Sequence, residues 1–271
     1  MCLLVALHRV HPDSPLVVAA NRDELLAREA TAMTVLDEGP PRVLGGRDHA
    51  AGGTWLAINE LGVVGDLTNR PAGQRDQARR SRGEWPLFLA GFETAAEAAE
   101  AFVAAFAPAD FNPGWVLVGD GRQLFYIDMT ERVGHPVELE PGTHILENRP
   151  LDGPSAKVDL LRRRLRGIDS VRGDELTERL RSLLASHAVP SAAEAEARQG
   201  FDGSPPRPPA ANAACVHLGA YGTRSATIVR TAAGAPPRVW SADGPLCRAP
   251  LVEVTGLWKA ATAAEEVGAS G

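Results

Sequence analysis

The residue with the clearest chemical potential is Cys2, which directly follows Met1. Methionine aminopeptidase removes Met1 when the next residue is small, and the chain would then begin with a thiol and a free α-amine on one residue. The pKa of an α-amine is about 7.7–8.0, so at neutral pH the amine can take a proton and return it to a leaving group. The structural alternative is a small apolar residue that opens a buried strand. Position alone therefore predicts either a nucleophile or a strand start.

A polar cluster follows the apolar run Leu16–Ala20 without a spacer. A hairpin that pairs Leu3–Leu7 with this run would bring the cluster toward Cys2. An arginine there would favour the thiolate, and a carboxylate would bind the α-amine. The alternative is a strand end whose charged side chains are solvated and form ion pairs with one another. The members of the cluster are Asn21, Arg22, Asp23 and Glu24.

Three further polar residues stand where strands are expected to end, namely Asn69, Asn148 and Arg224. An amide side chain at the mouth of a sandwich can donate a hydrogen bond to an oxyanion, although each residue alone could equally be part of a surface turn. Paired glycines in Gly45–Gly53 predict a tight loop with close backbone approach. The tryptophan that follows them, Trp55, is expected in the core or in a pocket wall.

Short apolar runs occur in pairs along the chain, which predicts antiparallel hairpins. Asp120-Gly121 is a strong hairpin turn between two of them. The expected strands are Leu3–Leu7, Leu16–Ala20, Thr54–Asn59, Gly62–Thr68, Trp115–Gly119, Gln123–Met129, Cys215–Leu218, Ser225–Thr231, Pro237–Ser241 and Val252–Val254.

Helical periodicity is expected over Ser81–Phe106, in two pieces with Thr94 capping the second, and over Ser155–Gly167 and Gly173–His187. The Pro/Ala/Gly-rich stretch Ala192–Ala211 is expected to be a flexible loop. Strand hairpins that alternate with helix pairs indicate layers outside the sheets rather than βαβ crossovers. The fold class is therefore predicted to be α+β, a four-layer αββα sandwich of two antiparallel sheets covered by helices, with residues 1–271 as one domain.

Composition excludes several classes of protein. A net charge of −6 over 271 residues argues against a nucleic-acid partner. Three cysteines, Cys2, Cys215 and Cys247, are too few and too scattered along the chain for a disulfide framework or a zinc site, and the seven histidines show no ligand spacing, so no metal is expected. The apolar run behind Cys2 is too short for a signal peptide or a membrane span. These features favour a reducing, cytoplasmic setting.

Several segments together resemble the NRDE family, the family of the transport and Golgi organisation proteins. They are MCLLVAL–HRVHPDSPLVVAANRDE, LGGRDHAAGGTWLAINELGVVGDLTN, RSRGEWP, ENRP and YGTRSATI. The family is in turn similar to the N-terminal-nucleophile hydrolases of the choloylglycine hydrolase and penicillin V acylase type, which share the αββα sandwich.

This resemblance implies roles for individual residues. Cys2 matches the nucleophile of those hydrolases, Asn69 the oxyanion-hole asparagine, Asn148 their second asparagine and Arg224 their late-strand arginine. The departure is in the second strand, where the hydrolases carry an arginine and an aspartate three residues apart and this chain has Asn21–Glu24.

Two functions follow as hypotheses. The first is an N-terminal cysteine hydrolase of a linear amide or acyl thioester, in which Arg22, Asp23 and Arg224 set the charge at the nucleophile. Its substrate contacts would be Asn21, Glu24 and Trp55. The second is a non-catalytic carrier of haem or acyl-CoA that uses the same fold, with apolar cleft walls as the binding surface; a purely structural role is the third reading. No cofactor is expected beyond haem as cargo, and the oligomeric state is open.

Overall fold

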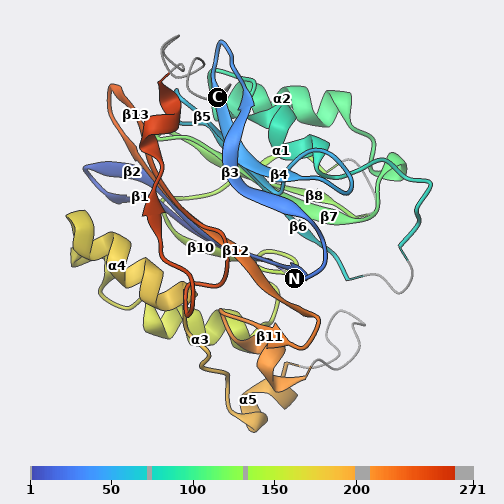
Figure 1. The fold of residues 1–271 in the computed structure, drawn as a ribbon, viewed down its shortest axis with the longest axis vertical. Helices are drawn as coiled ribbons and strands as arrows, with labels where there is room; N and C mark the ends of the chain where they lie inside the picture. The colour runs from blue at the N-terminus through green and yellow to red at the C-terminus, as the bar shows by residue number, and fades with distance from the viewer. Residues whose placement is uncertain (1, 72–74, 131–133, 199–207, 260–271) are drawn as a thin grey trace, which may run out of the picture.

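The structure is a computed structural model that describes residues 2–71, 75–130, 134–198 and 208–259, with Cys2 described by its backbone alone. Two antiparallel sheets of seven strands each dominate these residues (Figure 1). Within the described chain, no helix combines the length and the apolar character that crossing a membrane requires.

The first sheet is built around the N-terminal hairpin. Its order is β10-β1-β2-β12-β13-β14, and β11 pairs with β12 outside that path. The first and last strands of the described residues thus lie in one sheet, and the β12–β13 hairpin lies directly beside the β1–β2 hairpin. The strands are β1 (Cys2–His11), β2 (Ser14–Leu25), β10 (Gly142–Leu146), β11 (His217–Leu218), β12 (Tyr221–Ala232), β13 (Ala235–Ala242) and β14 (Val252–Glu253).

The second sheet is a meander in sequence order, β3-β4-β5-β6-β7-β8-β9. Every connection joins neighbouring strands, as the paired apolar runs predicted. The strands are β3 (Ala30–Asp37), β4 (Val43–Asp48), β5 (Leu56–Asn59), β6 (Val64–Asn69), β7 (Gly114–Gly119), β8 (Leu124–Met129) and β9 (Val137–Glu138).

Five α-helices lie among the described residues, and a side-chain hydrogen bond caps the start of α2, α3 and α5, whereas α4 has no such cap. The Thr94 side chain accepts a hydrogen bond from the Glu97 amide and begins α2, and Ser155 does the same for Val158 in α3. The helices are α1 (Glu84–Leu89), α2 (Ala95–Ala105), α3 (Ala156–Arg164), α4 (Gly173–Leu184) and α5 (Ala192–Glu196).

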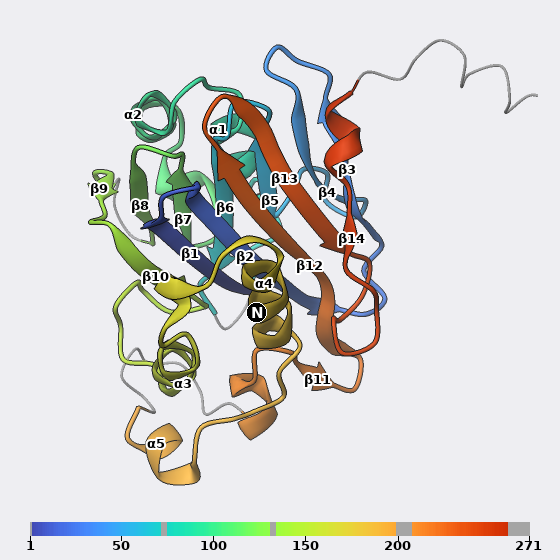
Figure 2. The ribbon, with the colours of Figure 1, turned by 90° about the vertical axis from the view of Figure 1, so that its left-hand side faces the viewer.

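The layers follow from alternation along the strands. In β1, Leu4 and Ala6 face the other sheet and pack with Leu56 and Ile58, whereas Leu3 and Val5 face the helices α3 and α4. The far face of the second sheet packs on α1 and α2 through Trp85 and Phe102, among others. Figure 1 shows α1 and α2 on one side of the sheet pair and α3 and α4 on the other, and Figure 2 shows α4 in front of β2 and β12. The predicted αββα sandwich is confirmed.

Some predictions of individual elements are wrong. β3 was not expected at all, and residues 45–48, which were expected to flank a tight loop, form the end of β4; the strand expected just before Asn148 is β10. β4 carries two adjacent glycines, so its local pattern is weak and its pairing with β3 and β5 determines it. The stretch Ala192–Ala211 begins with α5, whose capping box joins Ser191 and Glu194; its middle, 199–207, lies outside the described residues.

Candidate active site

The register of the N-terminal hairpin places the backbone of Cys2 opposite Arg22, at the first position of β1. On its other side β2 pairs with β12, where Arg22 lies opposite Ser225 and Asp23 lies opposite Thr223. The start of the chain therefore lies directly beside the polar cluster, as the sequence predicted. The Cys2 side chain and Met1 lie outside the described residues, so the sulfur itself is not placed.

Arg22 is buried between the sheets, with 5% of its surface exposed. Its guanidinium lies over the Trp55 ring at 4.3 Å from the centroid and 3.8 Å from the Asp48 carboxylate. Arg28 shares that carboxylate at 2.8 Å. The aromatic face and the shared aspartate hold Arg22 in place, and its positive charge remains next to the start of β1.

Two glycines make this arrangement possible. A Cβ atom on Gly46 would lie 2.0 Å from the Trp55 ring, and one on Gly45 would lie 2.5 Å from the Leu56 carbonyl oxygen. The tryptophan therefore packs flat against a stretch of β4 that has no side chains. The close backbone approach predicted for the paired glycines occurs, although in a strand rather than a loop.

A cavity of about 80 Å³ opens beside Arg22 at the end of both sheets. Four arginines line it against three carboxylates, so its described wall carries a net positive charge. We call it the arginine-lined cavity. Its lining residues are Arg22, Asp23, Glu24, Arg28, Asp48, Thr54, Trp55, Leu67, Asn69, Arg75, Ser81, Arg82 and Gly83.

Asp23 is buried and lies where β2 meets β12. Thr223 Oγ1 donates to its Oδ1 at 2.6 Å, and the same hydroxyl accepts from the Val216 amide at 2.9 Å. Burial raises the pKa of the Asp23 carboxyl, and the positive charge of Lys157 and the hydrogen bond from Thr223 act in the opposite direction. Burial is the largest of these effects, so the pKa of the Asp23 carboxyl is raised above its ordinary value.

Asn69 and Asn148 come together, but through unequal contacts. Asn69 is the last residue of β6 and lines the arginine-lined cavity. Asn148 follows β10, which pairs with β1, and is 2% exposed. Its Nδ2 donates to the main-chain oxygen of Asn69. Asn69 is thus the residue at the cavity, and Asn148 fixes the backbone that carries it.

Two of the predicted residues take other positions. Asn21 is not among the described lining residues: its Nδ2 donates to the carbonyls of Leu184 and Ala214, 2.9 Å each, on the helix side of the sheet. Arg224 occupies the register shift between Thr223 and Ser225, a bulge opposite Arg22 and Asp23. It also does not appear in the described lining. The Asn21 side chain thus binds backbone carbonyls on the helix side, and its role in substrate binding stays a prediction.

Several residues at this site were missed from the sequence. Asp48, Arg28 and Arg82 enter the cavity wall from loops and strand ends far apart in the chain. Lys157 is 1% exposed in α3, and no hydrogen-bond partner of its Nζ occurs among the described residues. It is one of only two lysines in the chain, and it stands in the apolar stretch that opens an amphipathic helix. A lysine in this apolar stretch is the feature of the sequence that could have indicated a buried charge.

Solved structures define the class of this fold. An N-acylethanolamine-hydrolyzing acid amidase ortholog from Caenorhabditis elegans aligns with a TM-score of 0.54 at 12% identity, over 84% of this chain and 92% of that one. A variant of the conjugated bile acid hydrolase from Clostridium perfringens aligns with a TM-score of 0.50 at 11% identity, over 95% and 94%. The architecture is that of the N-terminal-nucleophile hydrolases.

The family is shown by sequence. The model of the Transport and Golgi organisation 2 family matches residues 1–234, and the chain belongs to that family. Curated relatives are the Transport and Golgi organization protein 2 homolog of Bos taurus, 29% identical over 79% of this chain and 81% of that protein, and the Mus musculus homolog, 26% identical over the same shares.

Proposed function

We propose that this chain is an N-terminal cysteine hydrolase that cleaves a linear amide or an acyl thioester. The observation that carries the proposal is the register at the start of β1, which sets Cys2 opposite Arg22 and next to Asp23. An arginine-lined cavity with Asn69 in its wall opens at the same place. A nucleophile, a cation that favours its thiolate and an amide donor would therefore act on one carbonyl group.

The first half of the reaction forms a thioester with the enzyme. After removal of Met1, the Cys2 α-amine takes the thiol proton and the sulfur attacks the substrate carbonyl. The Asn69 amide donates to the oxyanion of the tetrahedral intermediate. The intermediate collapses, its C–N or C–S bond breaks, and the proton on the amine passes to the departing amine or thiol.

The second half releases the acid. Water gives a proton to the Cys2 amine and attacks the thioester carbonyl, the C–S bond to Cys2 breaks, and the sulfur recovers the proton. Arg22 balances the thiolate in both halves. Asp23 accepts a hydrogen bond from the ammonium form of the amine, which holds the amine in place for each transfer.

Charge indicates the substrate class. The described wall of the cavity holds Arg22, Arg28, Arg75 and Arg82 against Asp23, Glu24 and Asp48. A guanidinium group binds carboxylate or phosphate in a two-bond geometry, so an amide or thioester that bears an anionic group near its scissile bond fits this wall. N-acyl amino acids meet that description, because their carboxylate lies one carbon away from the scissile amide nitrogen, whereas the phosphates of acyl-CoA lie a full pantetheine arm away from the thioester.

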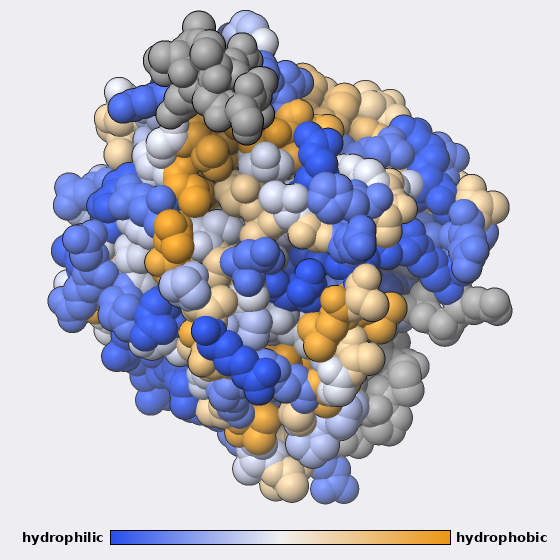
Figure 3. Space-filling model, viewed as in Figure 1, coloured by the Kyte–Doolittle hydropathy of each residue, from blue (hydrophilic) through white to orange (hydrophobic). Residues whose placement is uncertain are grey.

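The carrier hypothesis for haem has less support. Ligand and cofactor pockets are mostly apolar, whereas the described cavity has only Trp55 and Leu67 as large apolar lining residues. No histidine, methionine or tyrosine is among its described lining residues, and those side chains are the usual ligands of haem iron besides cysteine. On the face seen in Figure 3, hydrophobic patches are interrupted by hydrophilic side chains.

The test begins with the chain expressed without an N-terminal tag. Intact mass should show loss of Met1, and a thiol reagent should label Cys2 faster than Cys215 or Cys247. The processed protein should turn over members of a panel of acyl amides and acyl thioesters, and Cys2→Ala should abolish that turnover while the melting temperature stays nearly unchanged.

A matched control separates an N-terminal nucleophile from an ordinary thiol. One glycine inserted between Met1 and Cys2 keeps the sulfur but moves the free α-amine to another residue. We expect this chain to lose turnover as Cys2→Ala does. Wild-type protein with a verified free Cys2, no turnover on any amide or thioester, and tight binding of acyl-CoA or haem would establish a carrier instead.

A further inference from the structure

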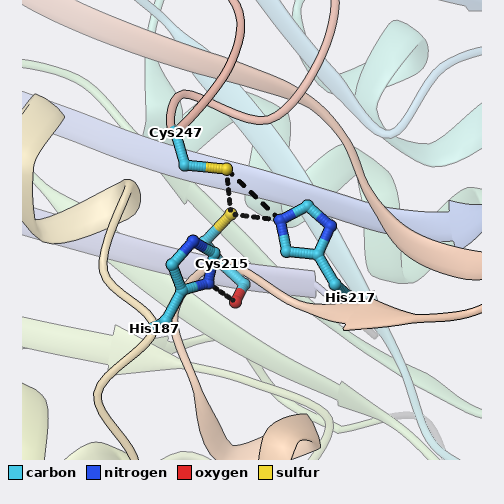
Figure 4. A group of neighbouring side chains, drawn as sticks. All are labelled: His187, Cys215, His217 and Cys247. Carbon is cyan, nitrogen blue, oxygen red and sulfur yellow. Dashed lines mark hydrogen bonds between the residues drawn. The ribbon is translucent and has the colours of Figure 1, made fainter.

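Four metal-binding side chains from distant parts of the sequence meet at one place outside the arginine-lined cavity. They are His187, Cys215, His217 and Cys247, and one ligand atom of each lies within 4.8 Å of the ligand atoms of the others (Figure 4). His187 follows α4, Cys215 and His217 flank the start of β11, and Cys247 lies in the loop between β13 and β14. We propose that this cluster is a structural zinc site, and the proposal is independent of any role of Cys2.

The distances among three of the four atoms already match a tetrahedral zinc site. Zn–S bonds of about 2.3 Å and Zn–N bonds of about 2.0–2.1 Å place neighbouring ligand atoms about 3.4–3.8 Å apart. The Cys215 and Cys247 sulfurs are 3.6 Å apart, and His217 Nε2 lies 3.7 Å from the first and 3.2 Å from the second. A cation at their centre would need no backbone movement from these three residues.

His187 is the fourth ligand, and its surroundings favour the tautomer that leaves Nε2 free to bind a metal. Its Nδ1 lies 3.2 Å from the Cys215 carbonyl oxygen, and it donates to that oxygen when it carries the ring proton. Nε2 is then left with its lone pair, and Figure 4 shows this nitrogen on the side of the Cys215 sulfur. Hydrogen bonding of the second ring nitrogen to a main-chain carbonyl is the usual support of a zinc-bound histidine. Since the four ligand atoms lie within 4.8 Å of one another, tetrahedral spacing requires the ring to approach the other ligands by up to about 1 Å.

The ligand chemistry selects the metal. Two thiols and two imidazoles form a Cys2His2 set, which favours zinc over the oxygen-binding cations magnesium and calcium. On binding, each thiol releases its proton to solvent, so the two thiolates balance the charge of Zn²⁺. Four protein ligands leave no open position for water or substrate, which makes the site structural rather than catalytic.

The position of the cluster indicates which segments a bound zinc would stabilise. The Cys215 amide donates to the Ser186 carbonyl, and the next residue, Val216, donates to Thr223, which holds Asp23. A cation bound here would tie the end of α4, the β11–β12 hairpin and the β13–β14 loop together. It would thereby fix the segment that supports Asp23 from the helix side.

The test measures metal content in the full-length chain without a histidine tag. After purification under reducing conditions and equilibration with zinc, the wild type should hold about one zinc per chain by mass spectrometry of the elements. Cobalt in place of zinc should give the visible absorption of a tetrahedral thiolate complex. Chelation should lower the melting temperature by about 5 °C or more, since binding to the native state alone stabilises it.

Variants identify the ligands. Cys247→Ser and His217→Ala should each weaken zinc affinity on the order of 100-fold or more, because loss of even an outer partner costs 10–100-fold. His49→Ala removes an exposed histidine that contacts Thr31 in the other sheet and should keep full zinc content. Cys2→Ala should also keep it, so loss of turnover and loss of metal are separate results.

Two outcomes would overturn the proposal. One is wild-type protein that takes up no zinc or cobalt under these conditions, including the case in which Cys215 and Cys247 are found joined in a disulfide after purification with reductant. The other is a Cys215→Ser/Cys247→Ser double variant that binds zinc as well as the wild type does.

Discussion

At the scale of single residues, Asn69 and Asn148 show how two side chains of one type take different roles. Asn69 ends β6 in the wall of the arginine-lined cavity, and Asn148 donates to the main-chain oxygen of Asn69 from a buried position. The first can face a reacting carbonyl, while the second fixes the backbone of the first.

These roles predict different effects of removal. Asn69→Ala should lower kcat by ~10²–10³ with an unchanged melting temperature, because it removes one oxyanion donor. Asn148→Ala should lower the free energy of unfolding by about 1–3 kcal/mol, because a buried hydrogen bond is lost, and should lower kcat through displacement of Asn69. Steady-state kinetics and urea unfolding check both. An Asn69→Ala enzyme with the wild-type rate would remove Asn69 from the mechanism.

At the scale of elements, β4 decides the position of Arg22. The strand brings Gly46 under the Trp55 ring, and the ring in turn lies under the Arg22 guanidinium. A side chain on the glycine would displace the tryptophan and with it the arginine. The paired glycines therefore belong to the site although they present no functional group.

Gly46→Ala should destabilise the protein by about 1–3 kcal/mol, as overpacking of a close contact does, and should reduce turnover and thiol reactivity of Cys2 together. The matched control is Gly256→Ala, where an added Cβ atom meets nothing within 4 Å and the backbone is not left-handed. Urea unfolding and the rate of thiol labelling measure the two effects. Equal behaviour of the two variants would mean that the contact between Gly46 and Trp55 has no influence on Arg22.

At the scale of the whole molecule, the apolar space between the two sheets contains a buried carboxyl group, that of Asp66. Asp66 in β6 is 4% exposed, and its side chain lies by the apolar residues Leu4, Ala6 and Leu117. Its Oδ1 has no hydrogen-bond partner in the described structure. Burial raises the pKa of the Asp66 carboxyl well above 3.8, so the folded protein keeps it protonated where the unfolded chain ionises it.

This pKa shift predicts a pH dependence of stability. The contribution of Asp66 is fully present below the unfolded pKa near 3.8 and is lost as pH rises through the raised pKa of the folded state. Asp66→Asn does not titrate, so its free energy of unfolding relative to the wild type should increase from about pH 4 upward. Urea unfolding over a pH series measures this difference. Asp13→Asn, which removes an exposed carboxyl in the β1–β2 turn, is the control, and a difference for Asp66→Asn that does not change with pH would contradict the shift.

The sequence by itself determined the parts of this protein that depend on near neighbours. Alternation in Leu3–Leu7 and Leu16–Ala20, joined by a short turn, predicts the hairpin and hence the proximity of Cys2 to Arg22 and Asp23. Thr94 predicted where α2 begins, because a cap acts within one turn. The order of hairpins and helix pairs was enough for the αββα sandwich.

Only the tertiary structure decided which distant segments of the chain contact one another. Asn21 and Asp23 lie on the same face of β2, yet Asp23 lines the cavity whereas Asn21 binds the carbonyls of Leu184 and Ala214 from distant parts of the chain. Cys215 and Cys247 looked scattered along the chain, yet their sulfurs lie 3.6 Å apart. The physical reason is the same in each case: contacts across 30 or more residues arise when packed layers bring loops to one edge, and no local spacing records which loops will meet.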